Sequence, residues 1–313
     1  AFVEETFTPQ AKNDTIKMVE DIKNAMRQDI DSLPWMSGET KKAAMAKLEK
    51  VEDRIGYPDT WRDYGSFEVK PNDALGNSLR ASKFEYQWQL SKLGKPLDRG
   101  EWWMTPQTVN AVNLPLQNAL NFPAAILEAP FFDPKADAAA NYGSIGAVIG
   151  HEVSHSFDNT GAEFDAEGGL RNWWTPADMA HFKAAANRLV KQYDAYEPLP
   201  GIHLNGQQVL GENIADVAGL TASYIAYKKS LGGKEAPVID GLTGDQRFFL
   251  AFAQAWRTKV RDAALRAAIV GDGHAPARFR AQTVRNITPW YDAYGVKAGE
   301  KMYLAPEDRV QVW

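Results

Sequence analysis

The HExxH pattern at residues 151–155 constrains this chain more than any other feature, because its two histidines can bind one metal ion only if the segment is a helix. On an α-helix His151 and His155 lie one turn apart on the same face, where both imidazoles reach one metal ion. Glu152 then lies beside that ion without having to bind it, and can take a proton from a water molecule there. The pattern predicts zinc and a hydrolytic reaction. The alternative is a helix that carries two unrelated histidines.

The sequence before the motif extends the predicted helix over residues 138–157. Gly143, Gly146 and Gly150 recur at spacings of three and four, which places them on one face and favours the close approach of another backbone. They do not form a phosphate loop, because no Lys-Ser/Thr pair follows them.

Elsewhere the apolar pattern predicts a mostly helical chain with a few short strands. We expect helices over residues 11–33, 37–56, 73–93, 175–196, 212–229 and 245–261. Residues 108–113 and the stretch around Phe122 alternate like strands, and the tail after Gly271 is expected to be mostly irregular. Composition changes near Trp102, so we divide the chain into a helical segment, residues 1–100, and a zinc-binding catalytic domain, residues 101–313.

Composition excludes several classes of protein. The net charge of -5 leaves no basic excess, so nucleic acid is not expected as a partner. No run of 18 apolar residues is present, so the sequence predicts no membrane-spanning segment. The absence of cysteine leaves His, Asp and Glu as the strong metal ligands. The first residues lack both an initiating methionine and a signal-like stretch, which is typical of a processed or truncated piece.

A catalytic zinc needs a third protein ligand and an open position for water or substrate. Glu212 and Asp216 lie four residues apart, so on a helix one carboxylate can reach the metal while the other fixes a ligand imidazole. Apolar neighbours would bury both carboxylates, which then need charged partners. The alternatives are a solvated acidic pair, or a third ligand nearer in sequence, at Glu163 or Glu167.

Together these patterns resemble the neprilysin family, the M13 zinc metallopeptidases. The resemblance rests on residues 148–158 and 211–216 and covers nearly the whole chain in order. Further matching stretches are residues 3–22, 52–58, 121–127, 173–175, 252–254 and 312–313. The resemblance implies an α+β, mostly helical fold. This fold is a thermolysin-like zincin catalytic lobe with a small mixed sheet and the HExxH helix, plus helical segments that link to a lid domain.

The resemblance also implies the metal chemistry. His151, His155 and Glu212 match the family's ligands to one zinc ion per chain. Glu152 matches its general base. Asp216 matches the carboxylate that supports a ligand histidine.

Other matches concern the substrate and the transition state. His274 matches the family's transition-state histidine and Arg280 the arginine that binds the substrate backbone, although a lone loop histidine is more often solvated. Asn110 and Ala111 match the pair that binds the substrate main chain, and Asp158 a carboxylate near a ligand. The family's hydrophobic specificity pocket corresponds to Ile126, Phe131, Val148 and Trp256. Without the family resemblance, these four residues would be interpreted as part of the hydrophobic core.

The chain departs from the family pattern in two places. Val112 and Asn113 stand where members usually carry aromatic residues, which puts the local strand geometry and substrate preference in question. Arg257 and Val310 stand where extracellular animal members have cysteines, which indicates a disulfide-free, bacterial-type member.

We therefore expect a zinc-dependent endopeptidase that hydrolyses oligopeptides on the amino side of bulky hydrophobic residues. The resemblance covers only the C-terminal half of a typical member, so its partner would be the N-terminal lid half, as a separate fragment or chain. A periplasmic or secreted location is favoured over a cytoplasmic one. The alternative function is a catalytically silent peptide-binding module that keeps a structural zinc site. His181 and His203 match nothing catalytic.

Overall fold

The computed structural model describes residues 1–312, so the terminal Trp313 of the resemblance lies outside it. It confirms a mostly helical α+β fold with one small mixed sheet. The long helices are α2 (Pro9–Ser32), α3 (Gly38–Lys50), α4 (Ala74–Leu90), α6 (Ala147–Ser154), α7 (Pro176–Asp194), α8 (Leu210–Ser230), α9 (Gly244–Ala255) and α10 (Asp262–Gly271). Shorter helices are α1 (Phe2–Thr6), α5 (Ala138–Asn141), α11 (Ala277–Arg280) and α12 (Thr288–Tyr294). The strands are β1 (Glu52–Gly56), β2 (Val112–Leu114) and β3 (Ala119–Pro123).

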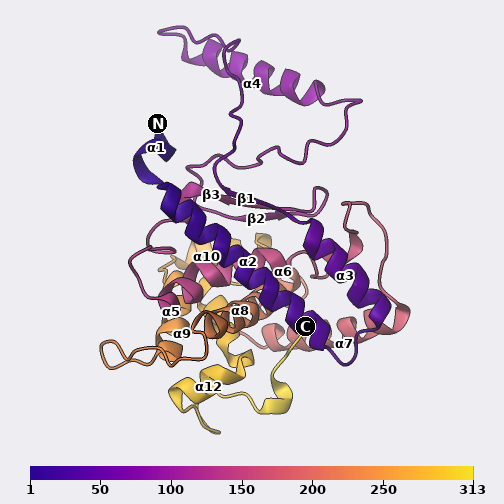
Figure 1. The fold of residues 1–313 in the computed structure, drawn as a ribbon, viewed down its shortest axis with the longest axis vertical. Helices are drawn as coiled ribbons and strands as arrows, with labels where there is room; N and C mark the ends of the chain where they lie inside the picture. The colour runs from indigo at the N-terminus through magenta and orange to yellow at the C-terminus, as the bar shows by residue number, and fades with distance from the viewer. Residues whose placement is uncertain (313) are drawn as a thin grey trace.

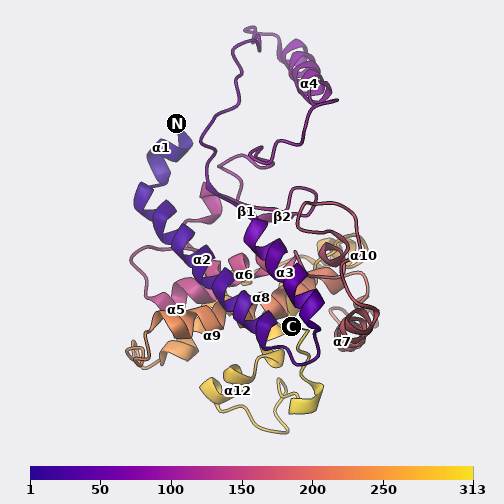
Figure 2. The ribbon, with the colours of Figure 1, turned by 45° about the vertical axis from the view of Figure 1, so that its right-hand side comes forward.

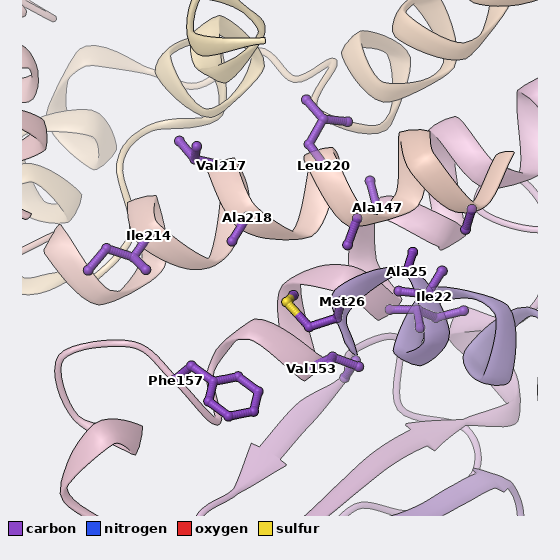
Figure 3. Packing of buried hydrophobic residues seen from close by; sticks show 14 of the residues in the cluster. Ile22, Ala25, Met26, Ala147, Val153, Phe157, Ile214, Val217, Ala218 and Leu220 are labelled. Carbon is purple, nitrogen blue, oxygen red and sulfur yellow. The ribbon is translucent and has the colours of Figure 1, made fainter. Parts of the chain in front are cut away.

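Helices α6 and α8 pack against each other at the centre, and α2 runs across both (Figures 1 and 2). Figure 3 shows the apolar side chains where these three helices meet. The labelled members are Ile22, Ala25 and Met26 of α2, Ala147 and Val153 of α6, Ile214, Val217, Ala218 and Leu220 of α8, and Phe157. Because α2 supplies part of this core, the first 32 residues help to hold the helix that carries the HExxH motif.

Glycines set the distance between the central helices, as their spacing predicts. A Cβ atom on Gly150 of α6 would lie 2.3 Å from the carbonyl oxygen of Gly219 in α8. A Cβ atom on Gly219 would lie 2.3 Å from the amide nitrogen of His151. Neither position can carry a side chain without moving a backbone. Gly143 is also closely opposed, since its Cβ would meet the carbonyl oxygen of Phe248 at 2.1 Å.

The helix before the motif contains a π-helical turn. Helix α5 continues through this turn, Tyr142–Gly146, into α6. The amide of Ile145 donates to the carbonyl oxygen of Phe131, at 3.1 Å. The hydroxyl of Ser144 also lies 2.5 Å from that oxygen. The turn therefore attaches the loop at Phe131 to the helix that leads into the HExxH motif.

The sheet has the strand order β1-β3-β2, with β1 parallel and β2 antiparallel to β3. The predicted helix from Ser37 toward residue 56 is wrong in its second part, because α3 ends at Lys50 and β1 begins at Glu52. There the backbone groups pair with β3, so that Ile55 lies opposite Phe122. Of the predicted strand over residues 108–113, only the end pairs, as β2.

The C-terminal region is more helical than the sequence analysis expects. The predicted helix over residues 245–261 ends at Ala255, and α10 follows as a separate helix. Beyond Gly271 the predicted irregular tail contains α11, α12 and short 3-10 turns. Local signals support α12, since Pro289 lies in its first turn and Gly295 ends it with a φ of 64°.

One segment stands away from the rest of the molecule. Helix α4 and the chain on either side of it extend beyond the body in both ribbon views (Figures 1 and 2), and the chain returns to the body at Arg99 and Glu101, whose carbonyl oxygens accept from Arg54. No residue of α4 is buried, and Leu75 is 74% exposed. The proposed division at residue 100 stays a prediction. Within residues 1–312, no helix is long and apolar enough to cross a membrane.

The glycine contact leads to a prediction about stability. Forcing extra atoms into a packed core costs about 1–3 kcal/mol where neighbouring side chains can move. At Gly150 a backbone would have to move instead, so Gly150→Ala should lower the free energy of unfolding by roughly 3 kcal/mol or more. Urea unfolding followed by circular dichroism measures this change. The control is Gly271→Ala in α10, because a Cβ there meets nothing within 4 Å. Equal stabilities of the two variants would contradict the prediction.

Candidate active site

His151 of α6, His155 at the C-terminal cap of that helix and Glu212 of α8 converge on one point. The Nε2 atoms of His151 and His155 lie 2.9 Å apart. Oε2 of Glu212 lies 3.1 Å from Nε2 of His151 and 3.7 Å from Nε2 of His155. Among residues 1–312, this is the group of three or more His, Asp or Glu side chains that could hold a metal, with ligand atoms within 4.8 Å of one another.

The hydrogen bonds around this group determine what it can hold. Nδ1 of His151 lies 2.8 Å from Asp216, and Nδ1 of His155 lies 2.7 Å from Asp158. If each Nδ1 donates to its carboxylate, each Nε2 presents a lone pair to the other and to Glu212. Oε2 of Glu212 is buried and lies 3.1 Å from Nε2 of His151 and 3.1 Å from Nε2 of His274. Facing lone pairs repel unless a cation lies between them, and two imidazoles with one carboxylate suit zinc.

Asp216 connects the ligand pair to Arg280. Its two oxygens accept hydrogen bonds from Nε and Nη2 of Arg280, at 2.8 and 2.7 Å, and Asp216 also meets His151. Burial raises the pKa of the Asp216 carboxyl, but Arg280 and His151 outweigh it and lower that pKa. The guanidinium lies over the ring of Trp256, 3.9 Å from its centroid. The ion pair with Asp216 uses Nε and Nη2 of Arg280, so the third guanidinium nitrogen, Nη1, does not take part in it.

Asp158 organises the turn that follows the motif. Its Oδ1 atom accepts from the amides of Thr160 and Gly161, at 2.8 and 2.6 Å, while Oδ2 holds His155. Lys47 of α3, 1% exposed, donates to the carbonyl oxygens of the same turn. These are Ser156, Gly161 and Phe164, at 2.6, 2.6 and 2.7 Å. Burial lowers the pKa of Lys47 to about 8, although Asp158 and Asp165 oppose this shift.

His274 reaches the same point from the loop between α10 and α11. Its Nε2 atom lies 3.1 Å from Oε2 of Glu212, and its side chain is 48% exposed. Nδ1 of His274 lies 2.8 Å from Asp272, a residue that the sequence analysis does not identify. Closeness to Glu212 raises the pKa of His274, burial lowers it, and the net shift is upward. The Asp-Gly-His sequence at residues 272–274 is the signal that could have identified Asp272.

A cleft of about 610 Å³ contains the convergent group. Its walls include Glu152 and the predicted substrate-binding residues Asn110, Ala111, Ile126, Phe131, Val148, Trp256 and Arg280. Of these, Asn110 is exposed, whereas Ala111 and Ile126 are buried. The structure thus brings the predicted residues to one concave surface, which includes both the polar Asn110 and apolar side chains.

The other candidate residues lie elsewhere. Glu163 and Glu167 are exposed, Glu167 pairs with Lys50, and neither belongs to the convergent group. His181 stacks on Trp35 with ring centroids 4.4 Å apart, which is a surface packing role. His203 is exposed, and its Nδ1 lies 3.2 Å from the carbonyl oxygen of Asp194.

Asn113 is a second residue that the sequence analysis does not place in the site. Its side-chain amide donates to the carbonyl oxygen of Glu152 at 2.8 Å and to the hydroxyl of Ser156 at 2.9 Å. In the sequence it appears only as a departure from the family pattern. Nothing local to Asn113 indicates that it touches the HExxH helix, 39 residues away.

Known proteins resemble this chain in both sequence and structure. Residues 110–310 and residues 1–58 match two sequence models described as peptidase family M13. An endothelin-converting enzyme homolog from Locusta migratoria is 37% identical over all of this chain, which covers 44% of that protein. A neutral endopeptidase from Lactobacillus helveticus is also 37% identical, over 98% of this chain and 46% of that protein. The chain therefore spans less than half the length of these relatives.

Solved structures agree with the sequence matches. An inhibitor complex of the zinc metalloprotease ZMP1 from Mycobacterium tuberculosis superimposes with a TM-score of 0.95 and 45% identity. The match covers 99% of this chain and 48% of that one. PepO from Lactobacillus rhamnosis matches with a TM-score of 0.91 and 35% identity, over 99% of this chain and 48% of that one. With a family model matched over residues 110–310, this chain belongs to peptidase family M13.

Proposed function

We propose that this chain is the catalytic half of a zinc-dependent endopeptidase that hydrolyses oligopeptides. The observation that carries the proposal is the convergence of His151, His155 and Glu212, with donor atoms within 4.8 Å, in a cleft that Glu152 also lines. These three residues would hold one zinc ion per chain. When bound, zinc supplies Lewis acidity toward the scissile carbonyl and the attacking water.

Glu152 and His274 are the groups that move or hold protons in this proposal. Glu152 follows the first ligand histidine and lines the cleft, so its carboxylate accepts the proton of the attacking water and delivers it to the leaving amine. Nε2 of His274, with Nδ1 held by Asp272, donates to the oxygen on which negative charge develops. Asp216 and Asp158 fix the ring orientations of His151 and His155.

The walls of the cleft suggest how a peptide binds. Asn110 and Ala111 on one edge would hydrogen-bond the substrate main chain, together with Arg280. The apolar wall would take a bulky side chain, so the enzyme would cut on the amino side of bulky hydrophobic residues. That wall is formed by Ile126, Phe131, Val148 and Trp256. A silent module with a structural zinc is less consistent with this site, because closed structural sites use four protein ligands.

The exposed segment around α4 suggests a partner. Leu75, Leu79 and Tyr86 of this helix are each more than 60% exposed, and such apolar surface usually marks an interface. The relatives are more than twice as long as the part that this chain matches. We therefore propose that the N-terminal half of the same protein, as a fragment or separate chain, covers this segment and restricts the cleft to oligopeptides.

The proposed third ligand can be tested by zinc binding. Glu212→Ala should weaken zinc binding by more than about 100-fold, because loss of a supporting group alone costs 10- to 100-fold. Glu163→Ala, on an exposed side chain, should leave the affinity within about 2-fold of the parent chain. Competition with a chromophoric chelator measures both affinities. The opposite order of effects would assign the ligand to Glu163.

The proposed base can be separated from the metal site. Glu152→Gln should lower kcat by about 10²- to 10⁴-fold while zinc content stays at that of the parent, since the amide cannot accept the proton. Hydrolysis of a fluorogenic peptide and metal analysis of the same preparation measure the two effects. Glu163→Gln is the matched surface control. A chelator should stop the parent enzyme and added zinc restore it; substantial turnover by Glu152→Gln would refute the assignment.

The proposed specificity and partner can be tested with a peptide library. We expect cuts on the amino side of bulky apolar residues, because the pocket wall is apolar. Mass spectrometry of the products, with and without the co-expressed N-terminal half, reads out both proposals. The N-terminal half should bind this chain. In its presence, the peptides that are cleaved should be shorter than those cleaved by this chain alone. Cuts that ignore the neighbouring side chain would contradict the pocket, and a half that does not bind would contradict the partner.

A further inference from the structure

Asn113 lies between the substrate-binding edge and the helix of the proposed base. It is the middle residue of β2, an edge strand of the sheet, and follows Ala111 by two positions. We propose that Asn113 is a positioning residue that fixes Glu152 relative to the strand edge at Asn110 and Ala111. This inference rests on the proposed peptidase function.

The end of α6 explains why an amide is needed there. The helix ends at Ser154, and the amide of Ser156 turns back to the carbonyl oxygen of Val153, at 3.2 Å. In a continuing helix, that amide would have bonded to the carbonyl oxygen of Glu152. This oxygen instead accepts from Nδ2 of Asn113, at 2.8 Å. A side chain from the sheet thus caps the helix at the residue that carries the proposed base.

The same amide also holds the next turn. Its second N–H bond points to the hydroxyl oxygen of Ser156, at 2.9 Å, and Ser156 is 3% exposed. The carbonyl oxygen of Ser156 accepts from Lys47 of α3 at 2.6 Å. The amide group is planar, so two bonds fix its orientation as well as its distance. The turn is therefore held from β2 on one side and from α3 on the other.

This arrangement sets a distance on which catalysis depends. Strand β2 has three residues and pairs with β3 in the sheet, so the backbone hydrogen bonds of the sheet do not join it to α6. The amide of Asn113 is the hydrogen bond that joins β2 to α6 at Glu152. A shift of the strand would carry a bound peptide with it, leaving binding intact but misplacing the scissile carbonyl. Misplacement by about 1 Å can cost about 100-fold in rate.

The test compares two asparagines with the same chemistry. Asn113→Asp keeps the size of the side chain but removes both N–H donors, and Asn113→Ala removes them without adding charge. Asn118→Asp is the matched control, because Nδ2 of this buried residue also donates to two carbonyl oxygens, those of Lys47 and Ala166 at 3.0 and 3.1 Å. Asn118 does not line the cleft.

Both Asn113 variants should lower kcat by about 10- to 100-fold with KM within about 3-fold of the parent, since substrate binding survives while alignment is lost. Asn118→Asp should lower the midpoint of thermal unfolding but leave kcat unchanged. If the Asn113 variants keep the parent kcat, or if their loss lies in KM, the proposal is wrong.

A second measurement does not require turnover. Amide hydrogen exchange of a peptide covering residues 150–157, in the zinc-free chain, should be faster in Asn113→Asp than in the parent and unchanged in Asn118→Asp. A parent chain that cleaves no peptide, with or without the N-terminal half, would defeat the proposed function. The exchange rates then decide whether Asn113 holds the turn, and equal rates in parent and Asn113→Asp would overturn the proposal.

Discussion

The contact between Gly150 and Gly219 is the constraint on which the site depends. Two helix backbones can approach this closely only where neither helix has a side chain at the point of contact. Here a Cβ on either glycine would meet the opposing backbone at 2.3 Å. His151 follows Gly150 directly, and Asp216 lies one turn before Gly219. The same contact therefore brings the first imidazole of α6 within 2.8 Å of the carboxylate of α8.

Burying so many charges requires that each has a partner. Asp158, Glu212 and Asp216 lie within one site, and an isolated carboxylate in such surroundings would be strongly destabilising. Arg280 neutralises Asp216, and backbone amides with His155 neutralise Asp158. Burial raises the pKa of the Glu212 carboxyl, but the neighbouring imidazoles of His151, His155 and His274 outweigh it and lower that pKa. The charge of Glu212 is therefore held at the point where the donor atoms converge.

The sequence predicted those features that depend on short-range spacing. The histidine pair, Glu212 with Asp216 and the helix glycines are all readable from patterns within a few residues. Strand β1 was missed because its pairing with β3 involves a segment more than 60 residues away. Asn113 could not be predicted, because an asparagine in a short strand is ordinary until its tertiary partner is known, whereas Asp272 has a local signal in its spacing of two residues from His274. The site could be identified from the sequence because histidines are rare in this chain and two of them lie at the fixed spacing of a helix turn.

The two matched regions and the exposed segment show how this chain is organised. The two matched regions, residues 1–58 and 110–310, contribute to one hydrophobic core, in which α2 packs on α6 and α8. The chain between them leaves the body and carries α4, which buries nothing. The body is therefore held together by the core, not by the segment that joins its two parts. Covering that segment would leave the contacts that hold His151, His155 and Glu212 unchanged, because the residues that make them lie outside it: Asp158, Asp216, His274 and Arg280.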